Sequence, residues 1–479
     1  MTRSMASYLA ADLGAESGRV ILGSLAGGRL EIEEIRRFPN QPVELPAGLY
    51  WDAFRLFHEI VEGLTIAGRE RHVKPAGIGV DTWGVDFGLV GADGGLIDCP
   101  RHYRDPRTNG VPDRLFETVP RAEVFARTGI QIMSINSLYQ LYSMRLAHSA
   151  ALENAGRLLF MPDLLNYWLT GVERNEVTFS STSQFYDPKA RRFATDMLER
   201  LGIPSRILAE LIEPGCTLGP LLPRLAESTG LGAVPVHAVG SHDTASAVAA
   251  VPARGDGWCY ISSGTWSLMG VESAAPVIDE QSYQLNFTNE AGVAGRTRLL
   301  KNIAGLWLLQ ECRRAWAAEG ERFGYEELMH MAEAAGPART IVDPDDFLQP
   351  GEMPARIAAW CREHSLEPPA TKGEFCRTIL ESLAHRYREV LEGLEGLTKS
   401  PIHTIHIVGG GSRNSLLNQL VADVTGRKVV AGPIEATAAG NLLVQAIGSG
   451  EASGLDEARE IVRQSFPITE FQPKSRAAN

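Results

Sequence analysis

The segment Val239-Gly240-Ser241-His242-Asp243-Thr244-Ala245-Ser246-Ala247-Val248 passes from an apolar run into a helical pattern of small residues. A carboxylate therefore lies between a histidine and a hydroxyl residue at a strand-to-helix turn, where side chains and helix-start amides can converge on a ligand. This position makes Asp243 a candidate general base. Aspartate is also a favoured N-cap residue, and for this segment taken alone a capping role is the commoner outcome.

A second turn favours the catalytic interpretation. The residues Ser262-Ser263-Gly264-Thr265-Trp266 form a tight, hydroxyl-rich turn suited to anionic oxygens. A base followed by a phosphate-binding turn predicts a kinase that phosphorylates a hydroxyl group.

Length and composition narrow the class of protein. A chain of 479 residues is long for a single core and predicts two domains or more, and 44% hydrophobic with 22% charged residues is ordinary for globular proteins. The formal net charge of −12 argues against sequence-independent binding to nucleic acid or to anionic membranes. Anionic ligands remain possible, because local amides and single basic residues can bind them.

Targeting and cysteine patterns predict a cytoplasmic protein without structural zinc. No uninterrupted apolar stretch reaches the length of a membrane span, and Met1–Ala6 lacks the apolar region of a signal peptide. The six cysteines contain no Cys-x-x-Cys pair, which argues against a zinc site. Cys361 and Cys376 flank a Pro-Pro loop, and we expect thiols there, with a disulfide on oxidation as the alternative.

Hydrophobic periodicity predicts a mixed α/β layer in the first half of the chain. The predicted strands are Ser7–Asp12, Val20–Leu25, Leu30–Phe38 and Gly77–Asp81, with a helix that starts from Asp52. Apolar residues recur at helical spacing on the predicted inner face of this helix, namely Phe54, Phe57, Ile60, Val61 and Leu64.

The same alternation recurs later in the chain. Strands are predicted at Trp258–Ser262, Ser267–Val271 and Ile405–Val408, and a long helix at Glu374–Leu394. The Gly- and Pro-containing segment Ala250–Gly257 is the candidate domain boundary.

Three Gly-rich segments are candidate phosphate or nucleotide sites. The turn in Asp12–Arg19 lets amides approach phosphates, and Asp12 could orient magnesium through water. Val408–Asn414 leads from a strand into an amphipathic helix, an arrangement that suits a nucleotide-binding site. It is not the dinucleotide fingerprint, because its Gly-x-Gly-x-x-Gly spacing is incomplete. The small residues of Gly432–Asn441 fit two alternatives equally, close approach of a flat ring or ribose and tight helix packing.

Two large kinase classes are excluded by their missing motifs. The sequence contains no Gly-x4-Gly-Lys-[Ser/Thr] and no protein-kinase His-Arg-Asp or Asp-Phe-Gly set. A kinase built on this sequence therefore belongs to another phosphotransferase class.

In their order along the chain, these segments resemble the FGGY carbohydrate kinases of the hexokinase/actin/Hsp70 superfamily. The resemblance covers most of the chain. Within the family, the sequence is most similar to the branch that phosphorylates L-rhamnulose. It is carried by Asp81–Phe87, Tyr103–Gly110, Ser241–Val248, Ser262–Gly270, Lys301–Gln310 and the segments that begin at Gly409 and Gly432.

The resemblance implies an α/β fold of two RNase H-like domains flanking a catalytic cleft. Residues 1–249 would be the mainly sugar-binding domain with the catalytic aspartate, and residues 250–479 the mainly ATP-binding domain. The implied reaction is ATP-dependent phosphorylation of L-rhamnulose at O1, with magnesium. The implied partners are this sugar and ATP, without nucleic acid or membrane, for a monomer or a weak homo-oligomer.

The resemblance also assigns residues. Asp243 would be the base, and the substrate contacts would be Gly84, His242, Asp243, Thr244 and Asn302. The ATP contacts would be Ala15, Glu16, Ser17, Gly18, Arg19, Thr265, Gln310 and Gly410, with Asp12 reaching the metal through water. Glu16 stands where the family usually has a smaller hydroxyl residue, so its carboxylate would have to turn outward or act through magnesium.

Three alternatives stay open at this point. The enzyme could act on another ketose, such as L-fuculose or a pentulose. A different class of function is an ATP-driven switch of the actin or Hsp70 kind, or a sugar sensor. For Trp83, an ordinary core position is favoured slightly over stacking on the sugar.

Overall fold

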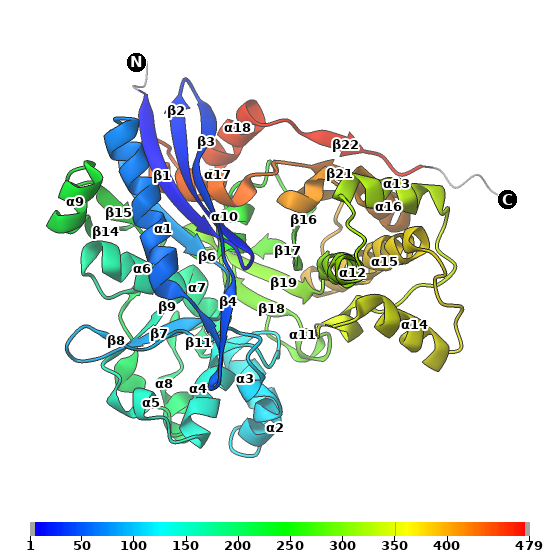
Figure 1. Cartoon of the computed structure of the whole chain (residues 1–479), viewed down its shortest axis with the longest axis horizontal. Coiled ribbons are helices and arrows are strands. Elements are labelled where there is room, and N and C mark those ends of the chain that lie inside the picture. The colour runs from blue at the N-terminus through cyan, green and yellow to red at the C-terminus, as the bar shows by residue number, and fades with distance from the viewer. Residues whose placement is uncertain (1–4, 350, 475–479) are drawn as a thin grey trace. The chain divides into compact units, whose positions relative to one another are not determined.

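The computed structural model describes residues 5–349 and 351–474. Most of the segment Met1–Ala6, for which no signal peptide was expected, lies outside the described residues. The described chain divides into two compact units (Figure 1). The first unit contains the chain up to Ala250, together with Glu272–Leu299 and Ala436–Ser465. The second contains Val251–Val271, Leu300–Glu435 and the chain from Phe466 onward. The chain's second half therefore contributes to both units.

The first unit is organised around a six-stranded sheet in the order β14-β15-β6-β1-β2-β3. Its strands are β1 (Ala6–Leu13), β2 (Ser17–Ala26), β3 (Arg29–Pro39), β6 (Gly77–Thr82), β14 (Thr217–Pro220) and β15 (Pro235–His237). The first three form an antiparallel meander, whereas β6 runs parallel to β1 and β15 parallel to β6. The four strands predicted in this region are confirmed.

Alternation along the strands sends side chains to two helical layers. Leu9, Ala11 and Leu13 share a hydrophobic core with residues of α1 (Ala53–Thr65) and α6 (Met161–Thr170). The opposite face is covered by α17 (Ala436–Gly448), which packs against β1, β6 and α10 (Asp243–Ala249) (Figure 1).

Helix α1 begins as predicted, but the prediction that Phe54 lies on its inner face is wrong. The Asp52 side chain accepts a hydrogen bond from the Arg55 amide and caps the helix. Phe54 is 58% exposed, and its ring stacks on Trp168 with centroids 5.4 Å apart. Leu56, which was not expected on that face, is buried instead.

A second core of the first unit surrounds a three-stranded sheet in the order β8-β7-β9. These strands are β7 (Phe87–Val90), β8 (Leu96–Asp98) and β9 (Arg157–Phe160). The longer helices of this region are α2 (Val111–Phe116), α3 (Arg121–Thr128), α4 (Ser137–Leu146) and α8 (Thr195–Arg200), whereas α9 (Pro223–Thr229) packs against α1.

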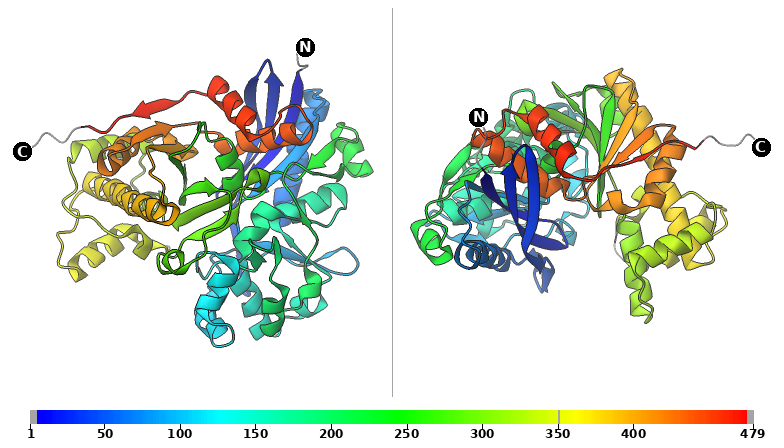
Figure 2. Two further views of the ribbon diagram at one scale, coloured as in Figure 1. Left: turned by 180° about the vertical axis from the view of Figure 1, so that it is seen from behind. Right: turned by 90° about the horizontal axis from the view of Figure 1, so that it is seen from above.

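In the second unit, β20 lies between β16 and β21 and runs parallel to both, while β17 pairs antiparallel with β16 and β22 pairs antiparallel with β21. The bounds are β16 (Trp258–Ser263), β17 (Ser267–Ser273), β20 (Thr404–Val408), β21 (Lys428–Ala431) and β22 (Thr469–Phe471). Packed helices of this unit, yellow-green to orange in Figure 2, include α12 (Trp307–Ala318), α13 (Tyr325–Ala334), α14 (Met353–Glu363), α15 (Lys372–Thr398) and α16 (Ser415–Thr425). The predicted strands and the long helix of this half are confirmed.

Two chemical expectations can be compared with the described residues. All six cysteines are free, including Cys361 and Cys376, in agreement with the expected thiols. Within residues 5–349 and 351–474, no helix combines the length and apolar character needed to cross a bilayer.

Candidate active site

Asp243 is the first residue of α10, directly beyond the carboxyl end of the parallel strands β15 and β6. The Thr82 amide donates to the Ser241 carbonyl at 2.9 Å, and Thr82 forms a parallel bridge with His242, which continues the sheet to the start of the helix. His242 occupies the N-cap position without a side-chain capping hydrogen bond. The capping alternative for Asp243 is therefore wrong, and its carboxylate is available for another role.

Two side chains approach the same oxygen of the Asp243 carboxylate. The Thr244 hydroxyl donates to Oδ1 at 3.1 Å, and His242 Nε2 lies 3.4 Å from the same atom. The side chain is 31% exposed, yet burial raises the pKa of Asp243 above its ordinary value, which His242 opposes and Asp12 reinforces.

Three carboxylates of the first unit interact electrostatically. Asp12 on β1 lies opposite Asp81 on β6 in the sheet register and forms an ion pair with Arg19 at 2.5 Å. Asp81 is fully buried, and its Oδ2 accepts a hydrogen bond from Asn441 at 2.5 Å. Burial, followed by the charges of Asp12 and Asp243, raises the pKa of Asp81 well above the usual range. Negative charge is therefore concentrated here, with Arg19 as a counter-charge.

The β1–β2 hairpin contains the predicted ATP residues Ala15, Glu16, Ser17, Gly18 and Arg19. The Gly14 amide donates to the Ser17 carbonyl at 2.9 Å and closes the turn. Asn40, the residue after β3, stabilises this turn, because its side chain donates to the Gly14 carbonyl at 2.8 Å and its amide to the Glu16 carbonyl at 2.9 Å. Glu16 is exposed. Gly18 is needed for packing, since a Cβ there would lie 2.3 Å from the Phe38 ring.

Gly84 lies beside His242, as the substrate-site prediction requires. A Cβ at Gly84 would be 3.3 Å from His242 Nε2 and 3.6 Å from Thr182 Oγ1. The structure thus brings Gly84, His242, Asp243 and Thr244 together within the first unit.

Trp83 belongs to the core, the alternative favoured from the sequence. It is 4% exposed, and its ring lies 4.1 Å from Trp51 between centroids. The indole nitrogens of Trp83 and Trp51 both donate to Asp86 Oδ2, at 2.9 and 2.6 Å. Burial raises the pKa of Asp86 to about 6, and these hydrogen bonds oppose that rise.

The second unit gathers three of the residues predicted to bind ATP. Gln310 Nε2 donates to Thr265 Oγ1 at 3.2 Å, and the Trp307 amide donates to the Thr265 carbonyl at 3.0 Å. Gly409, with φ +82°, lies against Ser263, while Gly410 next to it is exposed. These contacts bring the β16–β17 turn, the first turn of α12 and the Gly-rich turn after β20 to the same end of the sheet.

Asn302 lies on β19 (Thr297–Ile303), in the part of that strand that belongs to the second unit. The predicted substrate residues Gly84, His242, Asp243 and Thr244 belong to the first unit. The structure therefore divides this predicted set between the two units.

Sequence reasoning missed three side chains at the candidate site: Glu290, Arg298 and Asn441. Each comes from the second half of the chain but belongs to the first unit. For Glu290 and Arg298 the signal in the sequence was a charged residue within a strand, which does not identify its partner. Asn441 ends the small-residue segment Gly432–Asn441, whose pattern gave no role to its side chain. For the segment that contains Gly440, the sequence left two interpretations open, close approach of a ligand and tight helix packing. In the structure Gly440 packs against Ser246 of α10.

Comparison with known proteins gives consistent matches over nearly the full chain. Residues 7–250 match the model of the FGGY family of carbohydrate kinases, N-terminal domain, and residues 259–449 match that of the C-terminal domain. A rhamnulokinase from Bacteroides thetaiotaomicron is 47% identical over 474 residues, covering 98% of this chain and 97% of the relative. A rhamnulokinase from Bacillus subtilis is 40% identical over 474 residues, covering 98% and 95%.

Solved structures show the same fold. A gluconate kinase from Lactobacillus acidophilus has a TM-score of 0.81 at 15% identity, with 98% of this chain and 94% of that chain covered. A Plasmodium falciparum glycerol kinase with ADP has a TM-score of 0.77 at 14% identity, with coverage of 98% and 94%. The predicted α/β class with two domains is confirmed.

Proposed function

The chain belongs to the FGGY family of carbohydrate kinases, and we propose that this enzyme transfers a phosphoryl group from ATP to O1 of L-rhamnulose. The products are L-rhamnulose 1-phosphate and ADP, which places the reaction in rhamnose catabolism. Its relatives of the same length support this substrate. We further propose that its partners are the sugar and ATP, without nucleic acid or membrane, that it is a monomer or a weak homo-oligomer, and that it acts in the cytoplasm.

The observation that carries the mechanism is the arrangement around Asp243. Thr244 and His242 both approach Oδ1, and we therefore assign Oδ2 to the incoming proton. As the bond between O1 and the γ-phosphorus forms, the bond from phosphorus to the bridging oxygen of ADP breaks, and the O1 proton passes to Oδ2. The carboxylate suffices as acceptor because the hydroxyl becomes acidic only as the new bond forms.

The remaining predicted residues have positioning and charge-neutralising roles in this proposal. Gly84 leaves space beside His242, so a sugar hydroxyl can approach the ring and the Asp243 carboxylate together. In the second unit, Thr265, Gln310 and Gly410 would hold the nucleotide, with Asn302 contacting the sugar. In-line placement of the two reactants is the main demand of phosphoryl transfer.

Magnesium bound with ATP would neutralise charge on the transferring phosphoryl group. The carboxylate that would hold such an ion through water is that of Asp12, which lies opposite Asp81 in the sheet and whose charge acts on Asp243. Magnesium usually uses one or two carboxylates with waters and phosphates. Asp12 is the residue we assign to this role, with Arg19 as its present ion-pair partner.

Substrate selectivity is the test of the proposed function. We expect kcat/KM to be highest for L-rhamnulose in a panel with L-fuculose, L-xylulose, D-xylulose and glycerol. A methyl group distinguishes substrates by only about 1–3 kcal/mol, so measurable activity on related ketoses is also expected. A higher kcat/KM for another sugar would show that this sugar is the substrate, and the assignment as a sugar kinase would stand. ATP hydrolysis that is independent of every sugar would instead favour the switch or sensor.

Gly410→Val is expected to raise the KM for ATP at least tenfold while the KM for sugar changes less than twofold. A Cβ at Gly410 meets nothing within 4 Å in the protein, so the valine should not disturb folding. Its bulk would instead occupy the space in which we place the nucleotide. Steady-state kinetics with each substrate varied in turn, together with a melting curve, check this expectation. Equal increases in both KM values would contradict the assignment of Gly410 to ATP.

A further inference from the structure

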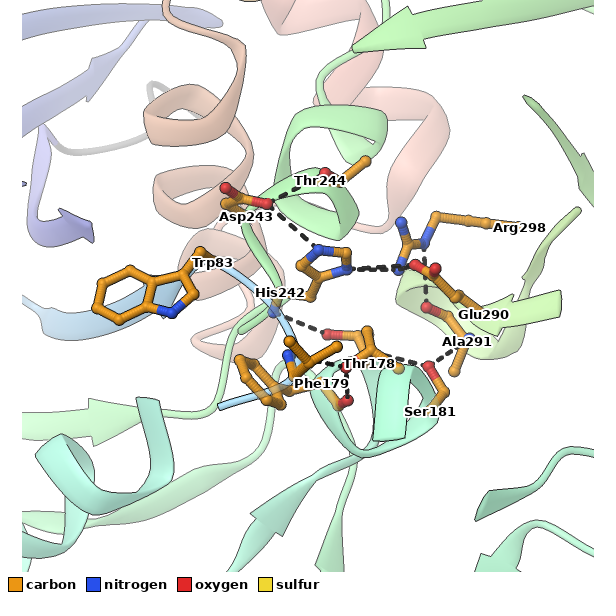
Figure 3. A network of polar contacts seen from close by, with 12 residues as sticks. Trp83, Thr178, Phe179, Ser181, His242, Asp243, Thr244, Glu290, Ala291 and Arg298 are labelled. Carbon is orange, nitrogen blue, oxygen red and sulfur yellow. Dashed lines mark hydrogen bonds and ion pairs between the residues drawn. The ribbon is translucent and has the colours of Figure 1, made fainter. Parts of the chain in front are cut away.

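The His242 ring lies between the candidate base and a buried ion pair (Figure 3). On one side, His242 Nε2 is 3.4 Å from Asp243 Oδ1. On the other side, Arg298 Nη2 is 3.2 Å from His242 Nδ1, and Glu290 Oε2 is 3.3 Å from the same nitrogen. Arg298 Nη2 and Glu290 Oε2 are 3.0 Å apart. These contacts join Asp243, His242, Glu290 and Arg298 into one network.

Both members of the ion pair are held rigidly inside the first unit. Glu290 on β18 (Thr288–Ala291) has a side chain 5% exposed, and that of Arg298 on β19 is fully buried. Arg298 Nε donates to the Ala291 carbonyl at 3.1 Å, and the Ala291 amide donates to Ser181 Oγ at 2.8 Å. Burial would raise the pKa of Glu290, but Arg298 and His242 outweigh it and lower that pKa, so Glu290 is ionised at neutral pH.

The backbone of His242 is fixed from the opposite side. Its amide donates to Thr178 Oγ1 at 3.3 Å, and the preceding Ser241 amide donates to Glu176 Oε2 at 3.2 Å. With the backbone secured, the free choices left to His242 are the rotation of its ring and the nitrogen that carries its proton.

The contact with Arg298 decides the second choice. His242 Nδ1 has two neighbours, the Arg298 guanidinium, which can only donate, and the Glu290 carboxylate, which can only accept. Because Glu290 Oε2 is already paired with Arg298 Nη2 at the shorter distance of 3.0 Å, we infer that Nδ1 accepts from Arg298. In the neutral ring the proton then lies on Nε2, the nitrogen that faces Asp243. In the other neutral tautomer the proton is on Nδ1 and Nε2 carries a lone pair. That lone pair would face the Asp243 carboxylate and be repelled by it.

We propose that Glu290 and Arg298 are positioning residues that fix the His242 ring with its Nε2–H directed at Asp243. Glu290 holds the Arg298 guanidinium in place, and Arg298 donates to Nδ1. The oriented Nε2–H then fixes Asp243 Oδ1, so that Oδ2 faces the sugar hydroxyl. This inference rests on the proposed function, in which Asp243 is the base.

The test is a double-mutant cycle between the ion pair and His242. Removing one partner would leave a buried unpaired charge and endanger folding. Both are therefore replaced together, as Glu290→Gln with Arg298→Met, a change that leaves the net charge unaltered. The matched control is Glu59→Gln with Arg36→Met, which removes another ion pair of the same unit whose charged atoms are 2.6 Å apart.

We expect the Glu290/Arg298 variant to lose about 10- to 100-fold in kcat, as for misplacement of a catalytic group, with the KM for ATP unchanged. In the His242→Ala background the same replacements are expected to change kcat less than twofold, because their effect passes through the ring. The control pair should leave kcat within twofold of the unmodified enzyme. An equal loss in both backgrounds, or no loss with His242 present, would overturn the proposal.

A second measurement does not depend on turnover. In enzyme labelled with 15N-histidine, the resonances that disappear in His242→Ala report the protonation of its two ring nitrogens. We expect a proton on Nε2 and none on Nδ1 in the unmodified enzyme, and loss of this preference in the Glu290/Arg298 variant. A protonated Nδ1 in the unmodified enzyme would overturn the proposal. An unmodified enzyme without activity on L-rhamnulose would refute the proposed substrate and leave the tautomer result standing.

Discussion

Asp243→Asn is expected to lower kcat by roughly two to four orders of magnitude, the usual contribution of a positioned general base. Asparagine keeps the shape of the side chain and can still accept the Thr244 hydrogen bond, but it cannot take the proton from O1. Sugar binding should therefore survive, and calorimetric titration with L-rhamnulose should give a Kd within a fewfold of the unmodified value. Near-normal turnover in this variant would refute the role of Asp243.

The pKa of Asp243 predicts how the unmodified enzyme responds to pH. Burial raises this pKa, and the base works only when ionised, so the acid limb of kcat/KM should lie above the pH at which an ordinary aspartate titrates. The raised pKa also means that the folded state is favoured by protonation of Asp243. The contribution of this protonation to the free energy of unfolding is fully present below the pKa that Asp243 has in the unfolded state. It is lost as the pH rises through the higher pKa of the folded state.

The same argument separates catalysis from stability in Asp243→Asn. Asparagine is neutral at every pH, so the variant should melt no lower than the unmodified enzyme at pH 7. The matched control is Asp196→Asn, which also removes a carboxylate from the first turn of a helix in the first unit but at an exposed position. This control should leave turnover within twofold, because Asp196 pairs with Arg127 at the surface, away from the candidate base.

Local sequence pattern predicted most of the strands and the position of the candidate base. Strand Gly77–Asp81 extends by one residue in the structure, and the hairpin after β1 forms where glycine allows the turn. Asp52 starts α1 because capping is decided by neighbours in sequence. The Asp243 position followed from the same kind of short-range signal, a strand that passes directly into a helix.

Contacts between distant segments could not be predicted in this way. Asp81 meets Asn441 across 360 positions, and His242 meets Arg298 across 56. Both depend on segments of the second half that return to the first unit, and hydrophobic periodicity carries no information on such pairing. The prediction for Phe54 was wrong for a related reason. Its ring stacks at the surface on Trp168, a residue far along the chain that the local pattern could not identify.

Gly440→Ala is expected to destabilise the protein, although alanine is the better helix former. Gly440 lies inside α17, where this exchange normally gains roughly 1 kcal/mol in helix propensity. A Cβ at Gly440, however, would lie 1.8 Å from the Ser246 carbonyl oxygen and 2.5 Å from its carbonyl carbon. Both atoms belong to the backbone of α10, so no side-chain rotation can relieve the clash. Overpacking of this kind costs about 1–3 kcal/mol, and we expect a net loss in the free energy of unfolding.

The clash with Ser246 links this loss to catalysis, because α10 begins at Asp243. Displacing α10 would move the carboxylate, and kcat should fall along with the melting temperature. Denaturant unfolding and steady-state kinetics measure the two effects, and Gly440→Val should exceed Gly440→Ala in both. Gly219→Ala is the control in the same unit, since a Cβ there makes only an ordinary 3.5 Å contact with Val172. Adding Ser246→Gly to Gly440→Ala should not restore stability, because the clashing atoms are main-chain; full restoration would show that α10 and α17 pack through side chains.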